Sequence, residues 1–142
     1  RLQQWCHGGT GRGFLVLDGD TGLNDRTVLR PDLQWFAAGR DIRAEERRSL
    51  PLGDLVVEVR SPSTWSRDIG IKRRLYEQHG AREYWLVDLI ARSVIRLHRD
   101  TDATGLDDGV ELTEDESLTT PLLPGFALPV ADVFADPTAD TT

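Results

Sequence analysis

The hydrophobic residues in the first hundred positions fall into short runs that end in polar turns. Phe14–Leu17 is one such run, and Asp18-Gly19-Asp20 follows it, which is typical of a strand that enters a turn. Two longer extended segments are expected at residues 28–36 and residues 54–60. In contrast, the Gly-rich start of the chain shows no strong periodicity and predicts no regular element.

A helix with several basic residues is expected from residue 67 to residue 79. Thr64 or Ser66 can cap its first turn, because a side-chain oxygen there can accept a hydrogen bond from a free backbone N–H group. Gly80 follows the helix and suits the left-handed conformation in which many helices end. The pattern therefore places a well-delimited helix directly after the strand at 54–60.

Downstream of this helix, the pattern predicts a hairpin and an apolar tail. Residues 83–88 and 94–98 are apolar and aromatic and predict two antiparallel strands. The strand at 54–60, the helix and the strand at 83–88 then form a crossover between parallel strands. The fold class is therefore α/β, with a mixed sheet flanked by helices. The apolar segment 121–129 is expected to pack along the body, and residues 130–135 to form a short last helix.

The composition favours a single soluble globular domain over residues 1–142. Hydrophobic residues make up 39% of the chain and charged residues 29%, and no apolar run approaches the length of a membrane span. The one cysteine, Cys6, excludes an intrachain disulfide. No signal peptide is visible, so a cytoplasmic location is expected. Because the chain begins with Arg1 and not with Met, a processed or truncated form is also expected.

Charge is distributed unevenly along the chain. The net charge is −7, which by itself argues against a nucleic-acid partner. Residues 1–99, however, contain all 17 Lys and Arg against 13 acids, whereas residues 100–142 contain 11 acids and no base. Within the first part, residues 60–82 carry six bases against two acids. A local basic face is thus compatible with the sequence, and so is an ordinary solvated helix surface.

Glu58 is a carboxylate in the middle of an otherwise apolar strand. Its neighbours are Leu55, Val56, Val57 and Val59. A charge in such a place is costly unless it is paired or binds a metal. Asp32 is the second acid next to a predicted strand, and alternation places it on one face with Gln34 and Phe36. These two carboxylates are the candidate site.

Two strand carboxylates on one face of a sheet are suited to Mg²⁺, which takes one or two carboxylates together with waters and phosphate oxygens. Mn²⁺ is an alternative, and the backbone carbonyl of Val59 could add a ligand. Such a metal can bind a scissile phosphate oxygen and generate hydroxide from water. A nearby cation would orient that water and stabilise the developing charge. Lys72 and Arg60 are the candidates for this cation.

Each of these residues also has an ordinary structural explanation. Pro-Asp is common in turns, and Glu58 could form a buried salt bridge. Asp68 and Lys72 are four residues apart, which also describes a routine ion pair on a helix surface. Tyr76, on the same stripe of the helix, is more often an aromatic residue that packs at a rim. Single residues therefore do not decide the function.

The order of these segments carries more information than any one of them. Along the chain come Arg30-Pro31-Asp32, then DLVVEVRSPST at residues 54–64, then Asp68 with Lys72 and Tyr76, then EYWLVD at residues 83–88. This string resembles the Uma family of bacterial putative restriction endonucleases, in the PD-(D/E)XK nuclease superfamily. The resemblance runs from about Arg30 to the segment 121–134. It implies a restriction-endonuclease-like core: a mixed sheet with helices on both faces and a Mg²⁺ site at one edge.

The resemblance also implies roles for individual residues. Asp32 corresponds to the motif aspartate and Glu58 to the motif acid. Arg60 stands where the superfamily pattern has lysine, and arginine cannot exchange a proton at neutral pH. We therefore expect Lys72, on the helix, to take the role of that lysine. Because family members usually begin with a further helix and hairpin, the resemblance implies that this chain is N-terminally truncated.

The leading hypothesis is a Mg²⁺-dependent DNA endonuclease. Asp32, Glu58 and the Val59 carbonyl would bind the metal, and Lys72 would orient the attacking water. Arg60, Arg67 and Arg73 are candidates for contacts with DNA phosphates, and Asp68 and Tyr76 are secondary site positions. DNA is the expected partner, no membrane is expected, and a homodimer is compatible with the sequence.

Two rival hypotheses remain at this stage. One is a catalytically inactive domain of the same fold that acts in DNA or protein binding. Arg60, the expected truncation and the acidic tail favour it. The other is an unrelated α/β protein in which Glu58 is structural. The separation of the Asp32 and Glu58 carboxylates and the Lys72 amine distinguishes these hypotheses best.

Overall fold

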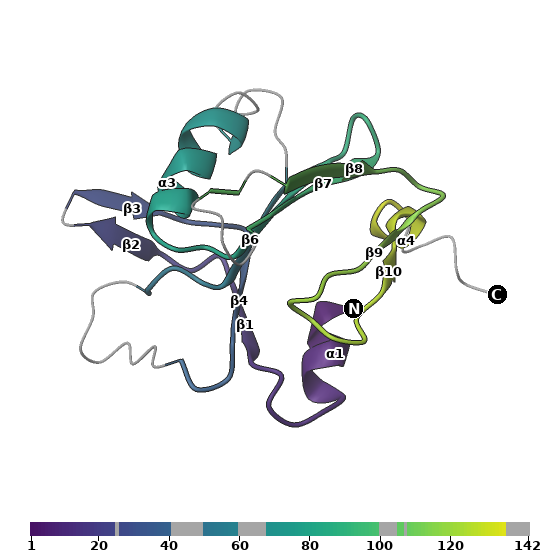
Figure 1. The fold of residues 1–142 in the computed structure, drawn as a ribbon, viewed down its shortest axis with the longest axis horizontal. Helices are drawn as coiled ribbons and strands as arrows, with labels where there is room; N and C mark the ends of the chain where they lie inside the picture. Colours follow the sequence, from purple (N-terminus) through teal and green to yellow (C-terminus); the bar gives the residue numbers. More distant parts are fainter. Residues whose placement is uncertain (25, 41–49, 60–67, 100–104, 107, 136–142) are drawn as a thin grey trace.

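A six-stranded mixed sheet forms the centre of the molecule, in the strand order β1-β4-β5-β6-β7-β8 (Figure 1). The computed structural model describes residues 1–24, 26–40, 50–59, 68–99, 105–106 and 108–135. The sheet strands are β1 (Phe14–Leu17), β4 (Leu33–Phe36), β5 (Leu55–Val59), β6 (Glu83–Asp88), β7 (Ser93–His98) and β8 (Asp108–Leu112). Strands β5 and β6 are parallel, and the other neighbouring pairs are antiparallel. The predicted mixed sheet and the β6–β7 hairpin are thus confirmed.

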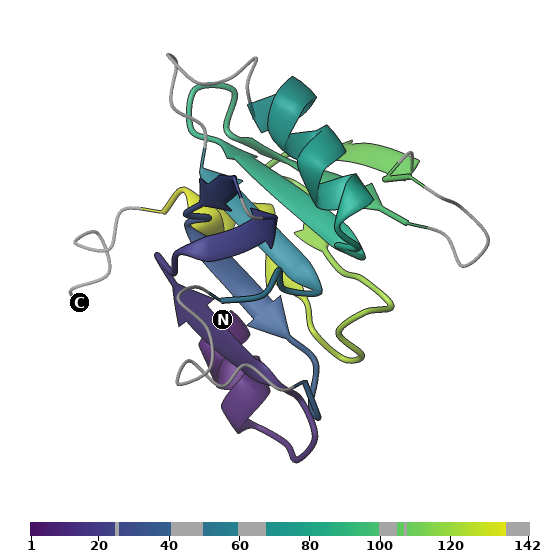
Figure 2. The same ribbon diagram turned by 90° about the vertical axis from the view of Figure 1, so that its left-hand side faces the viewer.

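Both faces of this sheet are covered (Figure 1). One face carries the helix α3 (Arg73–Gln78) and a separate hairpin of β2 (Thr21–Asn24) and β3 (Thr27–Leu29). Figure 2 looks onto this α3 face. The other face carries α1, α4 and a second small pair of strands, β9–β10. Their bounds are α1 (Leu2–His7), β9 (Ser117–Leu118), β10 (Leu128–Pro129) and α4 (Val130–Val133).

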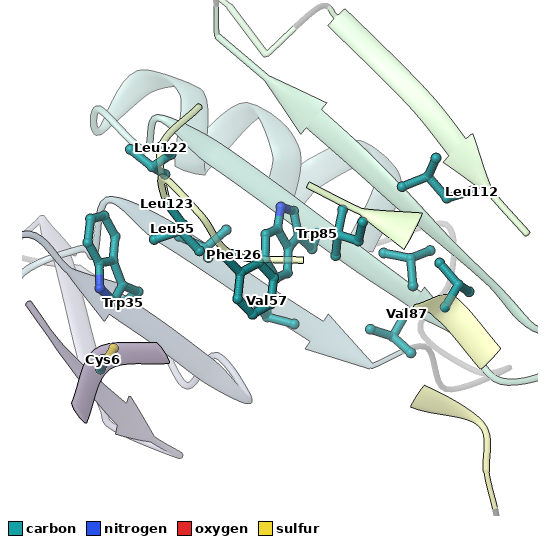
Figure 3. Close-up of a cluster of buried hydrophobic side chains, with 13 residues drawn as sticks. Cys6, Trp35, Leu55, Val57, Trp85, Val87, Leu112, Leu122, Leu123 and Phe126 are labelled. Atoms are coloured by element: carbon teal, nitrogen blue, oxygen red, sulfur yellow. The ribbon is translucent and has the colours of Figure 1, made fainter. Parts of the chain in front are cut away.

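The core on the α1 face is built from alternate residues of the central strands. Leu55, Val57 and Trp85 are all buried there (Figure 3). The C-terminal segment covers them, with Phe126 stacked on Trp85 at a ring-centroid distance of 6.0 Å. Leu123 of the same segment is fully buried. The prediction that the apolar tail packs along the body is therefore confirmed, and α4 is the short last helix.

The core on the α3 face positions the candidate site. The alternate residues Val56, Tyr84 and Leu86 are buried on this side of β5 and β6. Tyr76 from α3 is fully buried against them, and its ring meets that of Tyr84 edge-on at a centroid distance of 5.1 Å. Leu29 and a second leucine of the β2–β3 hairpin complete this cluster at its rim. The helix is thus anchored over the strand that carries Glu58.

Three local features differ from the sequence prediction. Helix α1 was not predicted, because its six residues are too few to show helical periodicity. The extended segment 28–36 is interrupted and forms β3 and β4, because Pro31 lacks an N–H group and fixes its own backbone angle. The short β2 strand, which contains Gly22, was also not predicted.

The helix expected over residues 67–79 is present, but it begins in an unusual way. Its first described turn is a π-helix, η2 (Asp68–Lys72), which continues as α3. Gly80, with φ of +89°, follows the helix end as predicted. The expected caps Thr64 and Ser66 lie outside the described residues. None of the helices in the described ranges is long and apolar enough to cross a membrane.

Candidate functional site

Asp32 directly precedes β4, and Glu58 lies in β5, the antiparallel neighbour of β4. In the antiparallel β4–β5 pair, Leu33 is opposite Val57 and Gln34 is opposite Val56. Asp32 is the residue before Leu33 and Glu58 is the residue after Val57, so both residues come directly after the last pair at this end of the ladder. Asp32 is exposed, whereas Glu58 is only 2% exposed. One carboxylate therefore faces solvent and the other is within the protein.

Backbone contacts fix the position of Asp32. Its Oδ2 accepts a hydrogen bond of 2.7 Å from the backbone N–H group of Val59, the last residue of β5. Its carbonyl oxygen accepts a bond of 3.2 Å from the N–H group of Asp18, just beyond β1. Asp32 thus joins the ends of three adjacent strands, and its carboxylate is held beside the end of the strand that carries Glu58.

Glu58 receives both of its described side-chain hydrogen bonds from one helix. Lys72 Nζ donates to Oε2 at 2.6 Å, and the Tyr76 hydroxyl donates to Oε1 at 3.3 Å. The side chain of Glu58 is 3% exposed and that of Lys72 is 19% exposed. The charge of Glu58 is therefore paired within the protein, as burial requires. Of the described candidates, Glu58, Lys72 and Tyr76 are joined by hydrogen bonds, and Asp32 is bonded to the backbone of Val59, the residue after Glu58.

The π-helical turn brings Lys72 over the sheet. Lys72 is the last residue of η2, and Tyr76 follows one turn later in α3, so both side chains project from the same stripe. Ile71, which the sequence places on the other stripe, is 57% exposed. The stripe that faces the sheet is therefore the one with Lys72 and Tyr76. Single π-helical turns are rare and are frequent at functional sites.

The remaining candidate residues are bonded to other groups, exposed to solvent, or outside the described residues. Arg73 donates to the carbonyl oxygen of Leu106 at 3.0 Å and lies 3.4 Å from Glu77 Oε1, so its guanidinium group holds a neighbouring segment. Val59 is at the solvent end of β5 and is 41% exposed. Arg60 and Arg67 lie outside the described residues, as does the side chain of Asp68.

Asp88 is a buried acid near the site that the sequence reasoning did not select. It ends β6, the parallel neighbour of β5, two residues after Leu86, which pairs with Glu58. It therefore shares a face with Glu58, and it is 4% exposed. Its Oδ1 accepts bonds of 3.0 Å from the N–H groups of Ile90 and Ala91, which shapes the following turn. A useful signal is present in the sequence: an acid that ends an apolar strand after a crossover.

The donor set at this site is suited to a hard cation. Asp32 and Glu58 supply carboxylate oxygens, which Mg²⁺ prefers. Within the described part of the chain, no group of three or more His, Cys, Asp or Glu side chains could hold a metal ion. Two carboxylates leave coordination positions for water and for phosphate oxygens, which is the usual arrangement for Mg²⁺ in phosphoryl chemistry. The residues present therefore fit this ion.

Comparison with known families identifies the family of the chain. Residues 1–131 match the model of the Uma2 family, described as "Putative restriction endonuclease". The chain belongs to the Uma2 family. No curated protein matches the chain. The family match thus confirms the resemblance inferred from the order of the motifs, over most of the length of this Uma2 chain.

A solved structure supports the fold of this Uma2 chain. The crystal structure of a putative nuclease belonging to DUF820, from Anabaena variabilis, superposes with a TM-score of 0.71. The similarity covers 94% of this chain and 74% of that chain, at 16% sequence identity. At this level of identity the comparison shows the fold. The predicted restriction-endonuclease-like core is therefore confirmed.

Proposed function

We propose that this Uma2 protein is a Mg²⁺-dependent DNA endonuclease that hydrolyses phosphodiester bonds. The observations that support the proposal are two contacts at the end of β5: Asp32 Oδ2 accepts from the N–H group of Val59 at 2.7 Å, and Lys72 Nζ lies 2.6 Å from Glu58 Oε2. Two carboxylates can bind a metal ion that activates water, and a lysine can stabilise negative charge on a phosphate. Family membership and the nuclease neighbour support the same reaction class.

Each residue has a distinct role in this proposal. Asp32 and Glu58 would bind Mg²⁺ together with the carbonyl oxygen of Val59, and the ion would polarise the scissile phosphate and lower the pKa of a bound water. Lys72 would orient the attacking water by hydrogen bonding and stabilise negative charge on the phosphate. Mn²⁺ is expected to replace Mg²⁺, because it also accepts carboxylate and water ligands.

The DNA contacts are expected from the basic residues next to this site. Arg60, Arg67 and Arg73 are the proposed phosphate contacts, and α3 also carries the exposed Arg74. Contacts with phosphate contribute to affinity without regard to sequence and weaken as salt concentration rises. The proposal therefore includes salt-sensitive binding of DNA of any sequence. For Arg73, this role requires exchange of its bond to Leu106 for a phosphate.

The test is nicking of supercoiled plasmid DNA with Mg²⁺, with Mn²⁺ and with EDTA. Nicking is expected with either metal and none with EDTA. Asp32→Asn and Glu58→Gln are expected to abolish it while circular dichroism shows an intact fold. Asp132→Asn is a matched control, because Asp132 is exposed and lies in α4 on the opposite face. Undiminished nicking in either site variant would refute the proposal.

A second candidate function is a catalytically inactive domain that binds DNA or protein. The Lys72–Glu58 ion pair favours it, because the buried carboxylate is already neutralised without a metal. Arg60 at the usual lysine position also favours it. Salt-sensitive DNA binding by the wild-type protein, with no nicking at millimolar Mg²⁺ or Mn²⁺, is the result expected for this function.

The proposal extends to assembly and location. We propose a homodimer, since cleavage of both strands of a duplex is served by two sites, and a cytoplasmic protein, since DNA is accessible there. Light scattering coupled to gel filtration measures the first. Cell fractionation of the expressed protein measures the second. A mass of one chain at micromolar concentration contradicts the homodimer.

A further inference from the structure

We infer that Tyr76 is a positioning residue that fixes Glu58 for metal binding. The inference rests on the proposed function and concerns how that function is supported. Its basis is that Tyr76 and Lys72, one helical turn apart, each donate to a different oxygen of the same carboxylate. Because the two donors differ in charge and in freedom of movement, they have different tasks.

The ring of Tyr76 is held rigidly. Tyr76 is fully buried, and its ring meets Tyr84 edge-on with the centroids 5.1 Å apart. Its carbonyl oxygen accepts a bond of 3.0 Å from the N–H group of Ala81, which is also fully buried. A tyrosine ring with this packing cannot change its rotamer without opening the core. The hydroxyl group therefore stays next to Glu58 Oε1.

Lys72 is held less firmly. Its side chain is 19% exposed and has four flexible bonds, and its bond to Glu58 Oε2 is an ion pair. A divalent cation competes with an ammonium group for the same carboxylate oxygen. The Tyr76 hydroxyl is neutral and binds the other oxygen, so it does not compete. With a cation bound at Oε2, Lys72 would be released to contact a phosphate, while Tyr76 would keep the carboxylate in place.

In this arrangement, neutralising the charge of Glu58 and holding its carboxylate in position are the tasks of two different residues. Lys72 would neutralise Glu58 without metal, and Tyr76 would hold Oε1 in place whether or not a metal is bound. Groups that orient metal-binding carboxylates in this way typically contribute 10-fold to 100-fold in metal affinity or activity. The ordinary alternative is a core tyrosine whose hydroxyl only satisfies its own need for a partner. The two roles predict different results for removal of the hydroxyl group.

In the experiment, the wild-type protein, Tyr76→Phe and Tyr84→Phe are titrated with Mg²⁺ or Mn²⁺. The shift in melting temperature is the signal that reports metal binding. Phenylalanine keeps the ring and its packing, so each variant is expected to fold. For Tyr76→Phe, the metal concentration that gives half of the maximal shift is expected to rise about tenfold. For Tyr84→Phe, which removes a hydroxyl from the same cluster, no change in that concentration is expected. Plasmid nicking at subsaturating metal is expected to fall in parallel and to recover at high metal.

The possible outcomes are separable. If Tyr76→Phe lowers the melting temperature without metal but leaves the half-saturating concentration unchanged, the residue is structural and the inference is wrong. An equal rise in both variants also overturns it, because the effect would then come from packing. If the wild-type protein shows no metal-dependent shift that Glu58→Gln abolishes, the proposed function fails and the inference fails with it.

Discussion

Lys72 Nζ lies 2.6 Å from Glu58 Oε2, and this ion pair is largely buried. The pair joins the only charged residue of β5 to the helix that crosses over to β6. It accounts for a carboxylate in an apolar strand without any metal. Under the proposed function, a metal ion bound at Glu58 would compete with this ion pair.

The first prediction concerns removal of this lysine. Lys72→Met keeps the apolar length of the side chain but leaves Glu58 without that counter-charge. Because removal of one partner from a buried ion pair is destabilising, the free energy of unfolding without metal is expected to fall by about 3 kcal/mol. A bound Mg²⁺ replaces the missing charge, so most of the loss is expected to be recovered in saturating Mg²⁺. Urea denaturation with and without Mg²⁺ measures both values.

Arg74→Met is the matched control for this substitution. Arg74 is an exposed cation two residues further along, so its removal is expected to leave stability and its response to Mg²⁺ unchanged. Plasmid nicking is expected to be lost in Lys72→Met and kept in Arg74→Met. An equal loss of stability in Lys72→Met with and without Mg²⁺ contradicts the competition between lysine and metal.

The features that the sequence predicted are those that depend on local patterns. The apolar run around Glu58 indicated a buried strand, and Leu55, Val56 and Val57 are buried. The apolar runs predicted β1, β4, β5, β6 and β7, and Gly80 predicted the end of α3. Each of these depends on neighbours within a few residues, which a single sequence displays directly.

The features that it could not predict depend on tertiary contacts. Nothing in the spacing of Glu58 and Tyr76 shows that they would be hydrogen-bonded, because they lie 18 residues apart. The sequence was equally compatible with Tyr76 as an aromatic residue at the rim of the core. In the fold, Tyr76 is fully buried. Asp88 was overlooked because its closeness to Glu58 depends on the parallel register of β5 and β6.

The second prediction concerns Gly13, which precedes β1. Its φ is +75°, and a Cβ atom there would lie 2.0 Å from the carbonyl oxygen of Phe36 in β4. Gly13→Ala therefore combines an unfavourable backbone conformation with a backbone clash, and a loss of more than about 2 kcal/mol is expected. Gly39→Ala is the control, because Gly39 has φ of +88° but nothing within 4 Å of the Cβ position. Its expected loss is about 1 kcal/mol. Similar losses in both variants, measured by thermal unfolding, contradict the clash.

The third prediction concerns Thr120, which ties the C-terminal segment to the sheet. Its hydroxyl donates to Oε1 of the fully buried Glu83 at 2.5 Å and accepts from the N–H group of Leu122 at 3.1 Å. Thr120→Val keeps the shape but removes both bonds, so a loss of about 2 kcal/mol is expected. Hydrogen exchange of the Phe126 amide should accelerate, because this segment covers the core. The exposed neighbour Thr119→Val is expected to change neither quantity. Unchanged exchange in Thr120→Val sinks this prediction.

The fourth prediction concerns the pH dependence of a surface ion pair. The Arg92 guanidinium group, at the turn between β6 and β7, is hydrogen-bonded to Glu114 and holds the pKa of that carboxyl below its ordinary value of 4.5. Since the pKa is lowered in the folded state, the contribution of the pair to stability is present above about pH 4.5 and is lost as pH falls through the lowered value. The contribution is small, because both side chains are exposed. A carboxyl titration by NMR is expected to give a lowered pKa for Glu114 in the wild-type protein and the ordinary value in Arg92→Gln.

The pKa of Asp20, which Arg30 lowers in the same way, serves as an internal control and is expected to stay lowered in that variant. If the Glu114 titration is the same in both proteins, Arg92 is not the cause of the shift.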